Sequence, residues 1–312
     1  MPHGGRRSKY MKISVLQQHP KYYGYSLENP PSLDYLKAQG EKTLNECFKM
    51  LEEAKAAGAD LAVTIETVNG ILGLGDVRYP YPEVYEGLDG ETVKRFSEAA
   101  KRLDMHIVAG LLLTLGDTTY NCAVLFDNEG EIVGIHKKVH LPAGEELHVG
   151  YGDKFEVFET KLGNIGMLVC WDLQFPEAVR ELALGGADLI ACPTLGWETT
   201  YGLARAYEAS VTLAIAMGFG KSGLPEEYKG YGDPSCIVNN MGKIIAEAPR
   251  NGEVVVTAEI DIKKEPDPQY NSQAFYKSHS MRKTRFSQRR PETYRLINVP
   301  LEQTPLYKRY FK

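Results

Sequence analysis

The chain has 312 residues, of which 43% are hydrophobic and 25% are charged, and its formal net charge is −5. A chain of this length buries roughly 75% of the surface that its unfolded form exposes, so a large core is available. The charges form no acidic or basic block, which argues against nucleic-acid binding. No apolar run approaches the roughly 18 residues that span a bilayer, so no membrane partner is expected.

The cysteines and the two terminal segments indicate the redox state of the chain and its domain organisation. Five cysteines without a C-x-x-C pair predict reduced thiols in a cytoplasmic protein, with neither a disulfide framework nor a zinc site. Residues 1–9 are interpreted as a flexible leader, since no apolar signal segment follows Arg6-Arg7. One domain is expected over 10–264. The polar residues 265–312 are expected to form an extended C-terminal arm, which either packs on a partner subunit or is solvated.

Strand-like runs alternate with helical stretches over residues 11–260. Apolar residues at i, i+3, i+4 and i+7 predict a first helix that ends at Gly58 and carries Leu44, Cys47, Phe48 and Leu51. A second helix carries Val93, Phe96, Ala100 and Leu103, and two more are predicted over 176–184 and 199–210. The predicted strands are 11–16, 61–65, 107–113, 121–126, 131–138, 155–159, 164–169, 188–192, 211–217, 235–239, 243–247 and 253–260. A hairpin signal at 127–130 interrupts βαβ repetition, and this order favours an α/β layered sandwich.

Three chemically active side chains follow predicted strands directly. Glu66 follows the strand 61–65, Lys138 ends the strand 131–138, and Cys170 follows the run 165–169. Because α/β folds bind ligands at the carboxyl ends of strands, these side chains would place a base, a cation and a thiol in one pocket. Taken singly, each also fits a structural role, such as a small core cysteine or a solvated lysine. The prediction therefore depends on their joint spacing.

Several ordered motifs carry a resemblance to a known family. The motifs are His136-Lys137-Lys138-Val139-His140-Leu141-Pro142, Glu145, Gly152-Asp153, Cys170-Trp171-Asp172, Phe175-Pro176-Glu177, Pro193-Thr194, Trp197-Glu198, Arg205-Ala206 and Ala258-Glu259-Ile260-Asp261. In order and spacing they resemble the nitrilase (carbon–nitrogen hydrolase) superfamily over about residues 11–262. The resemblance implies a four-layer αββα sandwich, with two mixed sheets flanked by helices, and assembly into a homodimer or a larger homo-oligomer.

The resemblance also implies a site of two glutamates, a lysine and a cysteine. By position, Cys170 is the nucleophile, Glu66 the general base and Lys138 the cation that stabilises the oxyanion. The second glutamate is Glu145 or Glu146. Glu145 is preferred, because the following Gly152-Asp153 lies at the interval expected from many members. The oxyanion and substrate contacts are expected from the Trp171 backbone N–H, Glu146, Gln174, Trp197 and Asn69, the last in a loop over 67–88 that would form a pocket wall.

The residues after Cys170 bear on the reaction. Nitrilases usually carry glutamate where this chain has Asp172, so the chain is more similar to the amidase and carbamoylase branches. Carbamoylases that act on N-carbamoyl-D-amino acids hold the substrate carboxylate with two arginines, where this chain has Leu173 and Gln174. The resemblance thus predicts hydrolysis of a small amide or N-carbamoyl amine through a thioester, with release of ammonia and without a cofactor.

Other interpretations stay open at this level. Nitrile hydrolysis and acyl transfer to an amine acceptor are alternative reactions, and a non-catalytic scaffold is an alternative function. A metal site is a weaker alternative, because no carboxylate or cysteine falls at helical ligand spacing beside His136, His140 and His148.

Overall fold

A computed structural model describes residues 10–21, 32–70, 85–218, 232–250, 252–262, 264 and 281–311. The predicted leader, residues 71–84 of the predicted pocket loop and residues 265–280 of the predicted arm lie outside these ranges. The chain divides into two units, Met1–Lys264 and Glu265–Lys312. Each unit is described by itself.

The described residues of the first unit form two mixed sheets of six strands each. The first sheet has the order β12-β1-β2-β3-β4-β5, and the second has the order β11-β10-β9-β8-β7-β6. The strands of the first sheet are β1 (Met11–Gln17), β2 (Leu61–Val63), β3 (His106–Leu115), β4 (Thr118–Phe126), β5 (Ile132–Lys137) and β12 (Val254–Ile260). Those of the second are β6 (Val157–Glu159), β7 (Asn164–Met167), β8 (Leu189–Thr194), β9 (Thr212–Met217), β10 (Cys236–Val238) and β11 (Ile244–Glu247).

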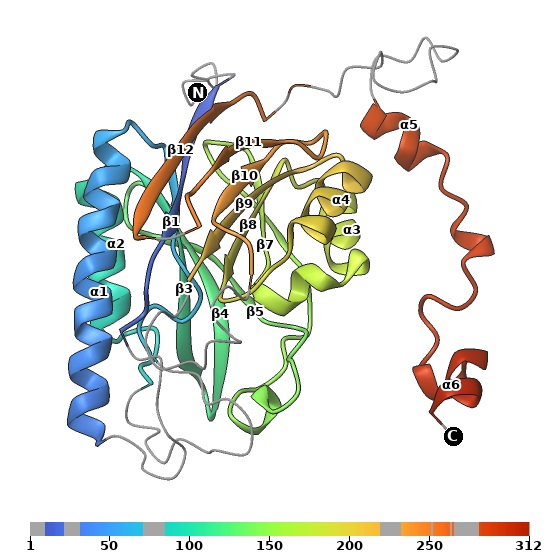
Figure 1. Ribbon diagram of the computed structural model, residues 1–312, viewed down its shortest axis with the longest axis horizontal. Helices are drawn as coiled ribbons and strands as arrows, with labels where there is room; N and C mark the ends of the chain where they lie inside the picture. Colours follow the sequence, from blue (N-terminus) through green and yellow to red (C-terminus); the bar gives the residue numbers. More distant parts are fainter. Residues whose placement is uncertain are drawn as a thin grey trace, which may run out of the picture. The chain divides into compact units, whose positions relative to one another are not determined.

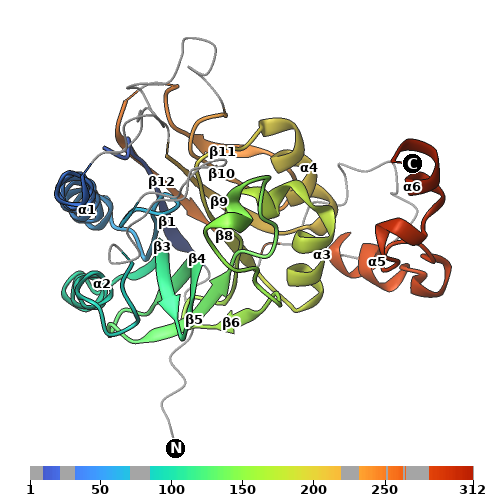
Figure 2. The same ribbon diagram turned by 90° about the horizontal axis from the view of Figure 1, so that it is seen from below.

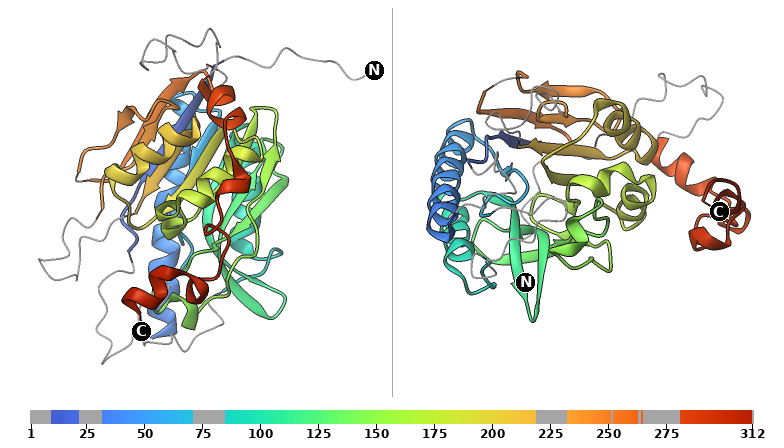
Figure 3. Two further views of the ribbon diagram at one scale, coloured as in Figure 1. Left: turned by 90° about the vertical axis from the view of Figure 1, so that its right-hand side faces the viewer. Right: turned by 60° about the horizontal axis from the view of Figure 1, so that its bottom comes forward.

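Helices cover the outer face of each sheet. Helices α1 (Leu33–Ala56) and α2 (Glu91–Arg102) lie on the first sheet, and α3 (Pro176–Leu184) and α4 (Thr199–Ala209) lie on the second (Figure 1). The order helix, sheet, sheet, helix is also clear from below (Figure 2) and in the right-hand view of Figure 3. The predicted αββα sandwich is confirmed. No helix in the described part of the chain is long and apolar enough to cross a membrane.

Strand alternation builds the apolar layers of this sandwich. Successive side chains of a strand point to opposite faces of its sheet. In β2, Leu61 and Val63 belong to the core between the two sheets, whereas Ala62 belongs to the core beneath α1 and α2. Ala191 and Ala214 contribute from the second sheet. Because both sheets are covered on both faces, their central strands β2, β3, β8 and β9 are mostly apolar.

The strands before Glu66 and Cys170 each end two residues earlier than predicted. The strand predicted over 61–65 ends at Val63, because the hydroxyl of Thr64 accepts the Gly110 N–H at 3.0 Å in place of a ladder carbonyl. The strand predicted over 164–169 ends at Met167 and leads into a 3₁₀ turn, η3 (Cys170–Gln174). Pro176 then opens α3, as expected of a residue that needs no N–H partner in the first helical turn.

The second unit corresponds to the predicted C-terminal arm and contains short helical segments that the sequence analysis did not predict. They are α5 (Met281–Ser287), η6 (Pro291–Thr293), η7 (Leu301–Gln303) and α6 (Pro305–Tyr310). The start of α6 follows from its sequence. The Thr304 hydroxyl accepts the Tyr307 N–H at 3.3 Å as an N-cap, and Pro305 occupies the first turn.

Candidate active site

Lys138 is the centre of a buried charged cluster. The residue follows β5, and its backbone N–H still donates to the Asn121 carbonyl at 2.8 Å, so the strand pairing holds it. Its Nζ donates to Glu66 Oε1 at 2.9 Å and to Glu145 Oε2 at 2.7 Å. Burial by itself lowers the pKa of Lys138, but the negative charges of Glu66, Cys170 as thiolate, and Glu145 outweigh it and raise the pKa. The ammonium therefore stays charged in a water-poor site.

Glu66 reaches this cluster from the end of β2 and connects the two sheets. Its Oε2 accepts the backbone N–H of Leu195, which follows β8 of the second sheet, at 2.9 Å. The backbone at Glu66 lies against Gly110 of β3, where an added Cβ would come within 2.8 Å of the Glu66 Cα. Only a residue without a side chain permits this approach, so Gly110 helps to define where Glu66 lies.

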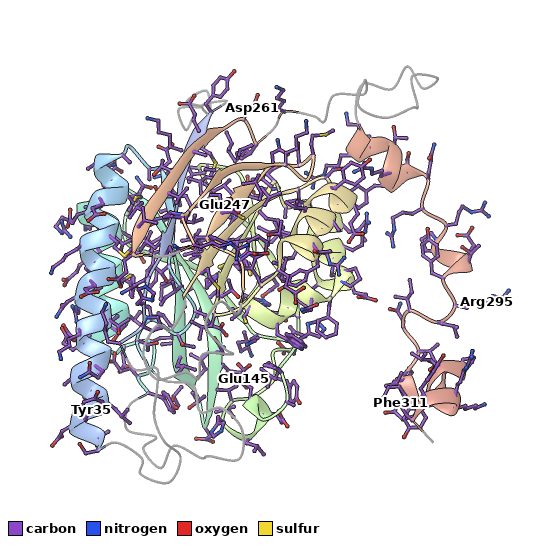
Figure 4. All side chains as sticks on the ribbon, in the orientation of Figure 1. Tyr35, Glu145, Glu247, Asp261, Arg295 and Phe311 are labelled. Carbon is purple, nitrogen blue, oxygen red and sulfur yellow. The ribbon has the colours of Figure 1, made fainter. Side chains whose placement is uncertain are left out.

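The loop after Lys138 presents Glu145 and not its neighbour to the lysine. Glu145, which is labelled in Figure 4, opens a short 3₁₀ turn, η2 (Glu145–Leu147). Its side chain is buried. Glu146 is exposed, and its Oε2 accepts the Gly144 N–H at 2.7 Å. Burial raises the pKa of Glu145, although hydrogen bonds from Lys138 and Asn121 oppose the increase.

The glycine of the Gly152-Asp153 motif closes this loop. The Gly152 N–H donates to the Lys138 carbonyl at 2.7 Å, and a Cβ on Gly152 would lie 2.0 Å from the Lys137 carbonyl oxygen. A larger residue would push the loop outward. Both ends of the segment from Glu145 to Gly152 are therefore bonded to Lys138. Glu145 accepts from its Nζ, and the Gly152 N–H donates to its carbonyl.

Asn121 joins the two glutamates, and the sequence analysis missed it. Its Nδ2 donates to Glu66 Oε1 at 2.7 Å and to Glu145 Oε1 at 2.9 Å. The side chain is completely buried on β4. A buried polar side chain is unusual and needs a partner. In the sequence, Asn121 directly precedes the apolar run at 122–126, and this position is the signal that points to it.

Cys170 has a strained backbone conformation. Its φ of +47° lies in the left-handed region, which costs a non-glycine residue roughly 1–3 kcal/mol and persists only where the surroundings enforce it. The residue is half-buried, and its Sγ lies 3.7 Å from the Gly196 carbonyl oxygen. Burial and then the negative charge of Glu66 raise the pKa of the thiol to about 12, against the opposing effect of Lys138. At neutral pH the thiol is therefore protonated.

The remaining predicted contact residues are placed differently. Trp197 is buried and its Nε1 donates to the Pro234 carbonyl at 3.2 Å. The Asn69 amide pairs with both backbone groups of Leu112, each at 2.9 Å. The polar groups of these two side chains thus serve the fold. The Trp171 side chain is exposed, and Gln174 is held through its carbonyl, which accepts from Arg205 Nη2 at 2.8 Å. Substrate contact by these four residues stays a prediction.

The histidines considered for a metal site have other partners. His136 Nε2 and His140 Nδ1 both hydrogen-bond to the carboxylate of Asp172, at 2.8 and 2.9 Å. Over the ranges that the structure describes, no group of three histidine, cysteine or acidic side chains is placed to hold a metal ion.

Comparison with known proteins agrees with this geometry. The family model for carbon–nitrogen hydrolases matches residues 13–265. The chain is 30% identical to a nitrilase of Pyrococcus abyssi over 81% of this chain and 90% of the relative. It is 29% identical to omega-amidase NIT2 of Xenopus tropicalis, over 71% of this chain and 83% of the relative. It is 28% identical to N-carbamoylputrescine amidase of Arabidopsis thaliana, over 69% and 79% respectively.

A solved structure shares the fold. The carbon–nitrogen hydrolase of Helicobacter pylori G27 aligns with a TM-score of 0.74 over 94% of this chain and 99% of that chain, at 23% identity. The fold and the buried site define a nitrilase-type enzyme. The chain belongs to the carbon–nitrogen hydrolase family, as its motifs predicted, and is an enzyme of that class.

Proposed function

We propose that this enzyme hydrolyses the C–N bond of a small amide or N-carbamoyl amine through a thioester on Cys170 and releases ammonia. The observation that carries the proposal is the buried cluster of Glu66, Lys138 and Glu145, in which the charges of Glu66 and Lys138 act on the Cys170 thiol. A nucleophile, a base and a fixed cation in one site are the parts that acyl transfer needs.

The hydrogen bonds of Glu66 identify the atom that takes the proton. Oε1 accepts from both Asn121 and Lys138, so its two lone pairs are used. Among the described residues, Oε2 accepts the Leu195 N–H alone and keeps one lone pair. We therefore assign Oε2 as the base. It takes the thiol proton while Sγ bonds to the carbonyl carbon, and it then gives that proton to the leaving nitrogen as the C–N bond breaks.

Two donors are available for the oxyanion that forms in this step. Lys138 Nζ has three N–H groups, and the two glutamates accept two of them. The third faces the substrate in the proposed complex. The Trp171 N–H belongs to the first turn of η3, where amides have no acceptor within the helix. Each donor of this kind is typically worth about 2.7–4 kcal/mol in the transition state.

Water completes the cycle. Glu66 Oε2 takes a proton from the water molecule as the water oxygen attacks the thioester carbon. When the C–S bond breaks, Glu66 gives this proton to Sγ, which restores the thiol. Glu145 keeps Lys138 in place and balances its charge throughout. An amide substrate yields an acid and ammonia. An N-carbamoyl amine yields ammonia, carbon dioxide and the free amine.

The test is ammonia and carbon dioxide release from a panel of aliphatic amides, ω-amides, N-carbamoyl amines and nitriles. Ammonia from an amide, or ammonia with carbon dioxide from an N-carbamoyl amine, supports the proposal if Cys170→Ala abolishes it. Cys47→Ala is the matched control, since Cys47 is a buried residue of α1 in a separate apolar core. Turnover of nitriles alone, or full turnover by Cys170→Ala, overturns it.

A further inference from the structure

Asp172 stabilises the turn that carries the nucleophile. It lies two residues after Cys170 and is completely buried. Its Oδ2 accepts the Val169 N–H at 3.2 Å, directly before Cys170, and also accepts from His136 Nε2 at 2.8 Å. The Val169 N–H is a first-turn amide that has no acceptor within the 3₁₀ turn. One side of the carboxylate therefore holds the backbone on the amino-terminal side of the strained residue.

The other side of the same carboxylate holds the chain directly after Lys138. Oδ1 of Asp172 accepts the N–H groups of Val139 and His140 at 3.2 and 2.9 Å. It also accepts from His140 Nδ1 at 2.9 Å, and the His140 ring stacks on Phe175 with ring centroids 3.7 Å apart. Five donors thus converge on one buried side chain from two separate parts of the chain.

We infer that Asp172 is a positioning residue that keeps Cys170 in its left-handed conformation and fixes the thiol relative to Lys138. The inference rests on the proposed function, in which Cys170 is the nucleophile. The aspartate acts through the turn and touches no reacting atom, because its side chain is buried and every acceptor position faces a protein donor. The third residue of the Cys170-Trp171-Asp172 motif therefore acts on the geometry of the nucleophile and makes no substrate contact.

The role requires an ionised acid at this position. Burial raises the pKa of Asp172, but hydrogen bonds from His136 and His140 outweigh it, and the pKa falls below its usual range. An asparagine would turn its NH₂ group toward either the Val139 and His140 amides or the Val169 amide. Backbone N–H groups cannot become acceptors, so either orientation sets donor against donor.

The experiment compares Asp172→Asn with the parent enzyme, in full-length protein whose folding is checked by circular dichroism and thermal melting. Two quantities are measured: kcat and KM on an amide that the parent hydrolyses, and the rate at which iodoacetamide alkylates Cys170 at pH 8. We expect kcat to fall about 100-fold, with KM within threefold, because displacement by about 1 Å costs that much. Alkylation should become about tenfold faster as the thiol leaves the field of Glu66.

A folded variant whose kcat and alkylation rate both match the parent would overturn the inference. If Asp172→Asn does not fold, His140→Phe replaces it, since phenylalanine keeps the stacked ring and deletes one donor. This variant should lose about tenfold in kcat, as expected for one hydrogen bond to a charged acceptor. The matched control is His106→Phe, at a buried histidine on β3 outside the site. Equal kcat values for His140→Phe and His106→Phe would also overturn the inference.

Alkylation needs no substrate, which separates the two proposals. If the parent hydrolyses no member of the panel, the proposed function fails, while the alkylation rates still decide whether Asp172 positions the thiol.

Discussion

Asn121 offers the sharpest single test of the site, because it touches both glutamates and no substrate atom is assigned to it. Asn121→Ala removes the Nδ2 donor that Glu66 and Glu145 share, at 2.7 and 2.9 Å. Lys138 is then the one side-chain donor left to the two carboxylates among the described residues. Both carboxylates become freer to move and repel each other more strongly.

The magnitude follows from the two lost hydrogen bonds. A hydrogen bond to a charged group contributes about 1.5–3 kcal/mol, and water that enters the new space replaces part of this. If about 1.4–2.8 kcal/mol of the loss appears in the transition state, kcat/KM falls about 10- to 100-fold. The pH profile should change as well. Burial already raises the pKa of Glu145, and the Asn121 donor opposes that increase. Its loss raises the pKa further, so activity on the acid side is lost at a higher pH.

The assay is the dependence of kcat/KM on pH for the parent, for Asn121→Ala and for Gln17→Ala. Gln17 is a buried amide whose Nε2 donates to the Pro249 and Gly252 carbonyls, so this control removes the same kind of group away from the glutamates. The control should lose stability and keep the acid limb of the parent. A folded Asn121→Ala enzyme with the parental acid limb and kcat/KM within threefold would refute the reasoning.

Three further predictions follow from the same contacts. Glu66→Gln removes the negative charge that helps raise the Cys170 pKa, so alkylation at pH 8 should accelerate while hydrolysis falls at least about 100-fold; slower alkylation would contradict this. Glu145→Gln should lower kcat at least about tenfold more than Glu146→Gln, since the buried side chain alone reaches the lysine; equal losses would contradict the assignment. Gly110→Ala would place a methyl group 2.8 Å from the Glu66 Cα and should lower kcat about 100-fold in steady-state assays; parental kcat in the folded variant would disprove the steric argument.

Local patterns predicted most of the elements and the candidate site residues. Short apolar runs identified the strands before Glu66 and Cys170, a hairpin signal identified the strand before Lys138, and Pro176 marked the first turn of the helix after Cys170. These signals are readable because strand and helix periodicity repeat within a few residues. The ordered motifs then predicted the family and the αββα sandwich, both of which are confirmed.

Tertiary structure alone decided which groups meet. Glu66 accepts from Leu195, 129 positions away, across two sheets. Local periodicity carries no information on such a contact, because sheet order and sheet packing determine it. The choice between Glu145 and Glu146 depended on the direction of one 3₁₀ turn. Asn121 gained its role only when β4 brought its amide between two acids from other segments.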